Sequence, residues 1–255
     1  MKIEEKINKA TEKINKSNSI LVFTGAGIST ESGIPDFRSP DGIWSKYDPR
    51  LFTFEHFMSG RENRIKQWEL FLEIYEVFAA AKPNKAHLAC AQLEKAVKLH
   101  SIITQNIDGL HARAGNSPEK IIEIHGTAEK IKCIECGLRY DKKYILKQKD
   151  KGPQDFRCKK CYGILKPAAI LFGESMPVAE MEMAHKSAVN CDLCLCIGSS
   201  LTVYPAAYFP KLAKENGAEL IIINKDATDA DKISSIAIHG KAGETMERIT
   251  EGLKI

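Results

Sequence analysis

The stretch ILVFTGAGISTESGIPDFR, residues 20–38, indicates the fold class more directly than any other part of the chain. Its short apolar run is typical of a buried strand, and closely spaced glycines follow at once. Gly25 and Gly27 match the first two glycines of the G-x-G-x-x-G turn, which permit a tight turn and a close approach of the backbone to a pyrophosphate. Thr30 replaces the third glycine and Gly33 follows it, so the match is partial. We therefore expect a strand leading into a dinucleotide-binding loop that covers its ligand before a helix starts.

The end of this stretch carries a carboxylate, an aromatic ring and a guanidinium at Asp36, Phe37 and Arg38. Together these groups can bind a polar ring system and phosphates above the glycine loop. The alternative is a salt bridge between Asp36 and Arg38 within a structural loop. That alternative gives no role to Phe37.

Apolar strands alternate with amphipathic helices along the rest of the chain. We predict helices at 3–15, in the latter part of 41–82, after Pro83, and at 178–189 and 206–216. We predict strands at 19–24, 99–104, 121–124, 168–172, 192–197, 218–223 and 236–238. This alternation favours an α/β fold with a parallel sheet covered by helices on both faces. The Lys-rich segment 128–166 does not follow this alternation, and we interpret it as an insertion into the α/β domain.

Small and polar residues follow five of these strands. The sequences are GAGIS from residue 25, QNIDG from 105, HGT from 125, GSS from 198 and NKD from 224. Each of these sequences alone could simply form a turn. Because ligands bind beyond the carboxyl ends of parallel strands, five in succession predict a binding site at one edge of the sheet.

The cysteines give the sharpest signal for a metal. Cys133, Cys136, Cys158 and Cys161 form two C-x2-C pairs separated by 21 residues, close to the spacing of tetrahedral zinc sites. Four thiolates close the coordination shell, so we expect a structural zinc that holds together a lobe too small to have its own core. We expect the remaining cysteines to be core residues; they are Cys90, Cys191, Cys194 and Cys196.

Composition limits the classes of function. The 255 residues carry a net charge of +4 with scattered Lys and Arg, which argues against nucleic acid as the main ligand. The charged start MKIEEKINKATEK does not resemble a secretory signal, and no apolar run is long enough to span a membrane. We therefore expect a cytoplasmic protein that does not bind membranes, and we expect it to be a monomer.

His125 differs from the other histidines because it ends a predicted strand at the same edge as the glycine loop. An unperturbed imidazole titrates near pH 6.5, which suits a general base near neutral pH. The other six histidines have no nucleophile or metal partner near them in sequence, and we assign them no function. No G-x-S-x-G elbow or Walker-type lysine occurs, so the sequence does not favour serine hydrolysis or phosphoryl transfer.

Taken together, the motifs resemble those of the sirtuins, which are NAD-dependent protein lysine deacylases. The similar stretches are GAGISTESGIPDFRSPDGIW, TQNIDGLHARAG, IHGT, the two Cys pairs, LFGESMP, GSSLTVYPAA and IIINKD, in the family's order from residue 24 to about 226. The resemblance implies a Rossmann-like NAD-binding domain (1–127 and 167–255) and a zinc-binding lobe (128–166). It also implies that the module 41–82 contributes to the small domain, and that NAD and an acyl-lysine peptide meet in the cleft.

The resemblance also implies roles for single residues. His125 acts as general base on a ribose hydroxyl after the acyl oxygen attacks C1′ and nicotinamide leaves, and Phe37 shields the cationic sugar from water. Asn106 is the second catalytic residue. NAD contacts are implied at Gly25, Ala26, Gly27, Thr30, Asp36, Phe37, Arg38, Gln105, Asn106, Ile107, Asp108, His125, Gly198, Ser199, Ser200, Asn224, Asp226 and Ala242. The substrate cleft is implied at Ile170, Phe172, Gly173 and Val203.

Three points stay open at this stage. The same activated sugar would also permit ADP-ribose transfer to a protein or plain NAD hydrolysis. A non-enzymatic alternative is a zinc-ribbon module that recruits partners through residues 128–166. Ala168 and Ala169 stand where larger or polar residues are common in the family, which leaves the substrate cleft open in detail. No Tyr-x-x-Arg pair is placed to read an acidic acyl chain, so acetyl or longer neutral acyl groups are favoured.

Overall fold

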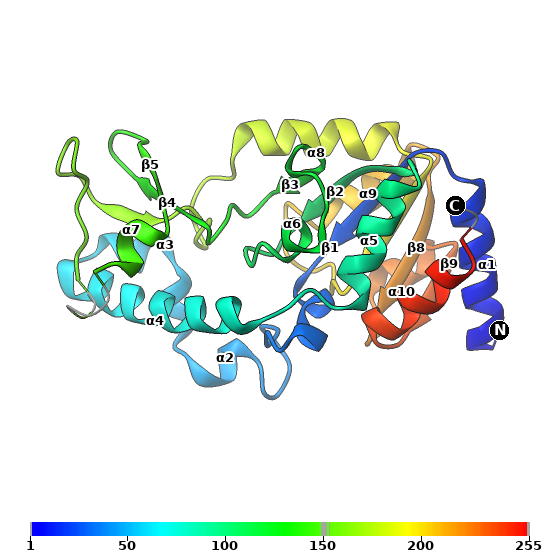
Figure 1. Cartoon of the computed structure of the whole chain (residues 1–255), viewed down its shortest axis with the longest axis horizontal. Coiled ribbons are helices and arrows are strands. Elements are labelled where there is room, and N and C mark those ends of the chain that lie inside the picture. Colours follow the sequence, from blue (N-terminus) through cyan, green and yellow to red (C-terminus); the bar gives the residue numbers. More distant parts are fainter. Residues whose placement is uncertain (1, 149–151, 153, 254–255) are drawn as a thin grey trace.

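The structure is a computed structural model and describes residues 2–148, 152 and 154–253. A large α/β unit lies at one end of the elongated molecule, and a small unit containing β4, β5 and α7 lies at the other (Figure 1). Among the described residues, no helix is both long and apolar enough to cross a membrane.

The large unit is built on a six-stranded sheet in which every neighbouring pair is parallel. The strand order is β3-β2-β1-β7-β8-β9. The strands are β1 (Ile20–Thr24), β2 (Leu99–Thr104), β3 (Ile121–Glu123), β7 (Leu193–Ile197), β8 (Glu219–Asn224) and β9 (Ile236–His239). The chain winds outward from β1 in one direction and from β7 in the other, so the order reverses between these two central strands. Ligands of such sheets bind at this switch point.

Helices cover both faces of the sheet, because its central strands are apolar on both sides. One face packs against α1 (Ile3–Lys16), α5 (Lys85–Lys95) and α10 (Ala242–Glu251), and the other against α8 (Val178–Asn190) and α9 (Tyr208–Glu215). In α1 the buried residues Ile7, Ala10 and Ile14 recur at helical spacing, as predicted. The predicted parallel α/β fold is confirmed.

The small unit contains an antiparallel sheet of order β5-β4-β6, formed by β4 (Lys130–Cys133), β5 (Arg139–Asp141) and β6 (Leu165–Pro167). The remaining helices are α2 (Ile43–Lys46), α3 (Phe54–Met58), α4 (Arg61–Ala80), α6 (Leu110–Ala114) and α7 (Lys143–Leu146). The long helix α4 begins at the small unit and runs toward the large one (Figure 1).

The lobe has a core, contrary to the expectation that it is too small for one, but α4 completes that core. Trp68, Phe71 and Tyr75 of α4 pack with apolar residues of the lobe. The rings of Trp68 and Phe156 meet edge to face with centroids 5.0 Å apart. The Tyr75 hydroxyl donates a hydrogen bond of 2.6 Å to the Ala128 carbonyl.

One predicted strand is wrong. Residues 168–172 form no strand; only Phe172 makes an isolated bridge, to Thr53. Lys166 explains the difference, because its buried ammonium binds the carbonyls of Pro167 (2.9 Å) and Ala169 (2.6 Å) and pairs with Glu174 (3.0 Å). Those carbonyls point toward a charge instead of toward a neighbouring strand.

Candidate active site

The loops that follow β1 and β7 lie in contact at the switch point. The Gly25 N–H donates to the Ile197 carbonyl (3.2 Å) and the Gly27 N–H to the Gly198 carbonyl (2.8 Å). A Cβ on Gly27 would lie 2.8 Å from the Gly198 Cα, and Gly198 has a left-handed φ of +62°. These glycines are therefore required because two protein loops approach each other closely. The dinucleotide-turn pattern explains its glycines differently, by the approach of the backbone to a pyrophosphate.

The loop after β2 is tied to both of these loops by side-chain amides. Gln105 donates from Nε2 to the Ser199 hydroxyl (2.9 Å). Asn106 donates from Nδ2 to the Gly25 carbonyl and to the Ser29 hydroxyl, at 3.1 Å each. Residues from three separate strand ends thus share one hydrogen-bonded cluster, as the clustering of polar residues at one sheet edge predicted.

Asp108 is a buried carboxyl in this cluster. It accepts hydrogen bonds from the Ser29 hydroxyl (2.7 Å) and from the Leu110 N–H (2.9 Å). Burial raises the pKa of the Asp108 carboxyl, and the two donors oppose that rise. Ser29 therefore contacts both Asn106 and Asp108, although sequence reasoning gave it no role.

Two buried histidines lie behind the cluster. The rings of His87 and His111 are 5.1 Å apart. His111 Nε2 lies 3.0 Å from the Thr24 hydroxyl, and His87 Nε2 lies 3.5 Å from the Ser29 hydroxyl. Burial lowers the pKa of His87 to about 4 and that of His111 well below 6.5, so both rings are neutral at pH 7.

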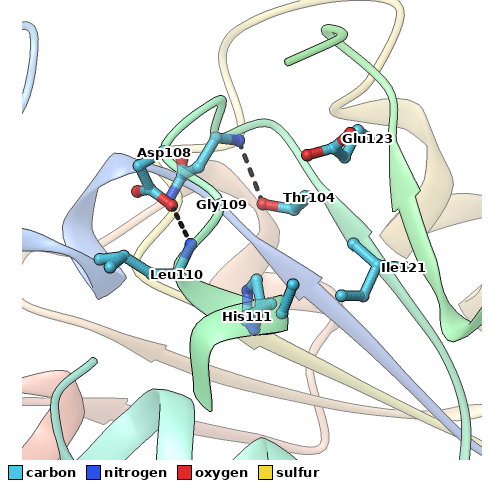
Figure 2. Close-up of a pocket in the computed structure, with 9 residues that line it drawn as sticks. Thr104, Asp108, Gly109, Leu110, His111, Ile121 and Glu123 are labelled. Atoms are coloured by element: carbon cyan, nitrogen blue, oxygen red, sulfur yellow. Dashed lines mark hydrogen bonds between the residues drawn. The ribbon is translucent and has the colours of Figure 1, made fainter. Parts of the chain in front are cut away.

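Sequence reasoning missed these two histidines because their partners are distant in the chain. The one local signal is the capping motif from Asn84 to His87, which the structure contains. Figure 2 shows His111 beside a cavity of about 20 Å³, lined in part by Thr104, Asp108 and Glu123.

His125 lies just beyond β3, and its ring is held in one tautomer. Its Nδ1 is 3.2 Å from the Gln105 carbonyl oxygen. Because a carbonyl can only accept, Nδ1 carries the proton and Nε2 of the neutral ring carries the lone pair. Burial lowers the pKa of His125, which favours this neutral form. The ring can thus accept a proton at Nε2, which is what a general base requires.

The segment beyond β6 runs directly beside His125. The Ile170 N–H donates to the His125 carbonyl (2.8 Å). Gly126 has a φ of +70°, and a Cβ there would lie 2.1 Å from the Ala168 carbonyl oxygen. Phe172, farther along, exchanges backbone hydrogen bonds of 2.9 Å with Phe52 and Phe54. Gly173 follows it as an exposed residue with φ +81°.

The aspartate and arginine that end the opening stretch do not pair with each other. The Asp36 carboxylate accepts from the backbone N–H groups of Arg38 (2.9 Å) and Ser39 (2.7 Å). The Arg38 guanidinium donates instead to the Ser200 hydroxyl (3.0 Å) and lies over the Trp44 ring. The salt-bridge alternative is therefore wrong: Asp36 stabilises the turn, and Arg38 connects this loop to the loop after β7.

Phe37 belongs to a partly exposed aromatic group. Its ring meets Trp44 and Phe52 edge to face, at centroid distances of 6.0 and 6.3 Å. Trp44 in turn lies 6.5 Å from Phe172, a predicted substrate residue. The covering loop and the segment beside His125 are thus connected through aromatic contacts.

The other predicted residues lie around this centre without joining its hydrogen-bonded cluster, as far as the described residues show. Ala26 and Thr30 lie in the glycine loop, and the Ile107 carbonyl accepts from the Ala128 N–H (3.0 Å). Val203 lies beyond β7. At the far side Asn224 ends β8, Asp226 is exposed, and Ala242 begins α10. The Gly243 N–H donates to Glu31 (2.7 Å), which places the start of α10 beside the glycine loop.

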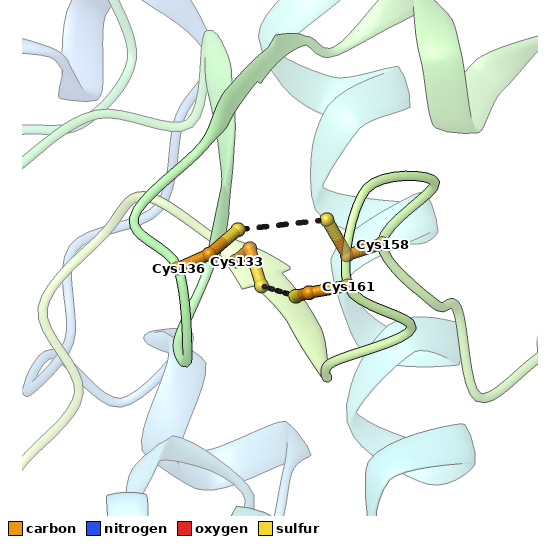
Figure 3. A group of neighbouring side chains, drawn as sticks. All are labelled: Cys133, Cys136, Cys158 and Cys161. Carbon is orange, nitrogen blue, oxygen red and sulfur yellow. Dashed lines mark hydrogen bonds between the residues drawn. The ribbon is translucent and has the colours of Figure 1, made fainter.

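The four predicted metal ligands converge in the lobe (Figure 3). Their sulfurs all lie within 4.8 Å of one another, with 3.5 Å between Cys133 and Cys161 and 3.7 Å between Cys136 and Cys158. A Zn–S bond of about 2.3 Å implies about 3.8 Å between sulfurs in a tetrahedron. The donor set and its spacing fit a structural zinc ion, as predicted.

The fold and these two centres define the class of protein: an α/β nucleotide-binding protein with an inserted four-cysteine zinc lobe. The pattern of the Sir2 family matches residues 25–205. The chain therefore belongs to the Sir2 family, and the resemblance to the sirtuins is confirmed.

Individual relatives agree over nearly the whole length. A NAD-dependent protein deacetylase of Thermodesulfovibrio yellowstonii is 45% identical over 250 residues, covering 98% of this chain and 96% of that protein. NAD-dependent protein deacylase 2 of Archaeoglobus fulgidus is 43% identical over 254 residues, covering 99% and 98%. A solved Sir2 structure with a p53 peptide and NAD⁺ superposes with a TM-score of 0.86 at 33% identity, covering 98% of both chains.

Proposed function

We propose that this protein is an NAD-dependent protein lysine deacylase. It removes acetyl or other neutral acyl groups from lysine side chains and transfers them to ADP-ribose, so it is a transferase that yields nicotinamide, O-acyl-ADP-ribose and free lysine. The observation that carries the proposal is the position of His125. Its unprotonated Nε2 belongs to a neutral, partly buried ring that is fixed to the same loop as Asn106 and Asp108.

The residues of the switch point have the chemistry that NAD needs. Bound NAD supplies an activated ribose whose bond to nicotinamide can break. We propose that the glycine loop, Arg38 and Ser200 hold the phosphates, because the backbone and a guanidinium converge there. Asn106 and Asp108 bind the nicotinamide end. His125 accepts a proton from a ribose hydroxyl, and Phe37 excludes water from the reacting sugar.

We propose the remaining contacts as the resemblance implies them. Adenosine is bound by Ser199, Ser200, Asn224 and Asp226, with further NAD contacts at Gly198 and Ala242. The acyl-lysine peptide is bound by Ile170, Phe172, Gly173 and Val203. Additional NAD contacts come from Ala26, Thr30, Asp36, Gln105 and Ile107. The exposed rings of Trp44 and Phe172 support a cleft that favours apolar acyl groups.

We also propose the domain boundaries that the sequence indicated: residues 1–127 and 167–255 for the NAD-binding domain and 128–166 for the zinc-binding lobe. The core that α4 shares with the lobe supports assigning 41–82 partly to the small domain. We propose a cytoplasmic location, in which cysteines stay reduced and can bind zinc; none of the eight cysteines forms a disulfide. We also propose, from the sequence, a monomer whose partners are acylated proteins, not nucleic acid.

The test is to mix purified protein with an acetyl-lysine peptide, with and without NAD, and to follow both products by mass spectrometry. We expect NAD-dependent deacetylation together with a matching amount of O-acetyl-ADP-ribose. His125→Ala should lower turnover at least about 100-fold while NAD binding and zinc content stay unchanged, because a positioned general base contributes on that order. His185→Ala, on the exposed face of α8, is the matched control.

Three results would count against the proposal in different ways. Full turnover by the His125→Ala variant would remove His125 from the reaction. NAD consumption without deacetylation would favour ADP-ribose transfer or a different acyl group. No NAD consumption by a folded, zinc-loaded protein would favour a binding module.

A further inference from the structure

Tyr140 contacts the metal centre without being one of its ligands. It lies in β5, shortly after the first cysteine pair, and its hydroxyl oxygen is 3.0 Å from Cys158 Sγ in the second pair. The same oxygen accepts a hydrogen bond of 3.1 Å from the Lys159 N–H. One phenol therefore binds the second cysteine turn at two adjacent residues.

The chemistry fixes the direction of both contacts. A backbone N–H can only donate, so the Tyr140 oxygen accepts from Lys159. A cysteine that ligates zinc is a thiolate without a proton, so Cys158 cannot donate when zinc is bound. The Tyr140 O–H must then donate to the Cys158 sulfur. Both hydrogen-bonding capacities of the phenol are used on one segment.

No other cysteine of the cluster has this kind of partner among the described side chains. Cys133 Sγ lies 3.4 Å from a Glu135 carboxylate oxygen, but an ionised carboxylate has no proton to donate to a thiolate. Tyr140 is thus the side chain that donates a hydrogen bond to a sulfur of this site. Donors around metal ligands orient the ligand and tune the metal, and their loss typically weakens metal binding 10–100-fold.

The ring of Tyr140 is itself held in place. It stacks on the ring of Tyr144 with centroids 4.8 Å apart and planes 24° apart. The Lys159 ammonium lies 4.7 Å from the centre of the Tyr144 ring, on the same segment that the Tyr140 hydroxyl binds. The phenol therefore joins the part of the lobe that carries the first cysteine pair to the turn that carries the second.

We propose that Tyr140 is a positioning residue for the structural zinc. It holds the Cys158 turn in ligating geometry and stabilises the Cys158 thiolate by hydrogen bonding, and it thereby slows the loss of zinc. The inference concerns retention of the metal and does not depend on the deacylase reaction.

The experiment compares zinc loss from the wild-type protein, Tyr140→Phe and Tyr144→Phe. The full chain is loaded with zinc and mixed with excess chelator and a zinc-sensitive dye, and the rate of release is recorded. Tyr140→Phe keeps the stacked ring and removes only the hydroxyl, so release should become at least about 10-fold faster. Tyr144→Phe is the matched control, because the Tyr144 hydroxyl makes no hydrogen bond within the described part of the lobe, and its rate should equal that of the wild type.

A second measurement distinguishes the loss of the hydrogen bond from a general loss of packing in the lobe, since either could speed zinc release. With Co²⁺ in place of zinc, loss of a hydrogen bond to a thiolate raises the energy of the sulfur electrons. The sulfur-to-cobalt charge-transfer band of Tyr140→Phe should therefore move to longer wavelength, while that of Tyr144→Phe stays in place. Unchanged release by Tyr140→Phe overturns the proposal. Faster release without a band shift also overturns it, because Tyr140 would then act through packing alone.

Discussion

The hydrogen bond from His125 to the Gln105 carbonyl determines which ring nitrogen can accept a proton. Burial lowers the pKa of the ring, and it outweighs this hydrogen bond, which favours the charged form. The base is therefore already deprotonated at pH 7 and needs no further activation. At the scale of the residue, the site has a general base of reduced basicity in a fixed orientation.

The lowered pKa of His125 predicts the acid limb of the pH profile. As pH falls through the lowered pKa, His125 gains a proton and can no longer accept one, so kcat/KM should fall with a midpoint below 6.5. The measurement is kcat/KM for the acetylated peptide from pH 5 to 8, with His185→Ala as a control that keeps the same midpoint. A midpoint above 6.5 would show that the burial argument is wrong.

Single residues also show the limits of sequence reasoning. The location of His125 and the convergence of four cysteines followed from strand ends and from spacing, both of which are local patterns. The pairing of Arg38 with Ser200, and the contacts of Ser29 with Asp108 and His87, join positions far apart in the chain. No periodicity within one segment encodes such pairs, because they arise only when the sheet brings the loops together.

At the scale of the element, helix ends are where local rules and this sequence disagree most clearly. The end of α5 forms a Schellman motif: the Lys98 N–H donates to Leu93 (3.1 Å) and the Val97 N–H to Glu94 (2.9 Å). Val97 occupies the left-handed position with φ +56°, where a β-branched residue is strained. The same motif at the end of α9 has Gly217 in that position, with φ +94°.

Val97→Gly should therefore stabilise the protein. Relief of the left-handed strain, less the greater chain entropy of glycine when unfolded, should raise the free energy of unfolding by about 1 kcal/mol. The side chain is 87% exposed, so little packing is lost. Urea denaturation of the zinc-loaded protein measures the change, and Val97→Ala, which keeps the left-handed strain, should gain less. Equal or lower stability of Val97→Gly would contradict the strain argument.

Element boundaries also depend on contacts that apolar patterning does not reveal, even where the partners are close in sequence. The strands of the main sheet were predictable because each is a short apolar run between turn residues. The failed strand at 168–172 is equally apolar, but the buried Lys166 binds the carbonyls at its start. The two zinc turns also differ, since Tyr162 has φ +61° at the position that Gly137, with φ +70°, occupies in the first turn.

At the scale of the whole molecule, the protein contains two kinds of core. The large unit has an apolar cluster on each face of its sheet, and neither cluster includes a residue of the zinc lobe. The third cluster joins the lobe to α4 and includes two of the zinc ligands, Cys133 and Cys158. A buried ion pair of 2.7 Å between Arg64 and Asp155 adds to this connection. Stability should therefore depend on zinc in one part of the molecule and not in the other.

Removal of zinc should unfold the lobe locally and leave the main sheet folded. Zinc sites of this kind contribute folding energy directly, because their ligands are assembled only in the folded state. Without the metal the four thiols are no longer held together, and the core that Cys133 and Cys158 share with Trp68 and Phe156 should open. Hydrogen exchange after chelation should thus lose protection in 130–146 and 61–80, while β1, β2, β7 and β8 keep theirs. Added zinc should restore the protection, which controls for irreversible damage.

Two outcomes would contradict this prediction. Equal loss of protection in the central strands would mean that the two units unfold together. Unchanged protection of α4 would mean that its packing on the lobe does not require the metal.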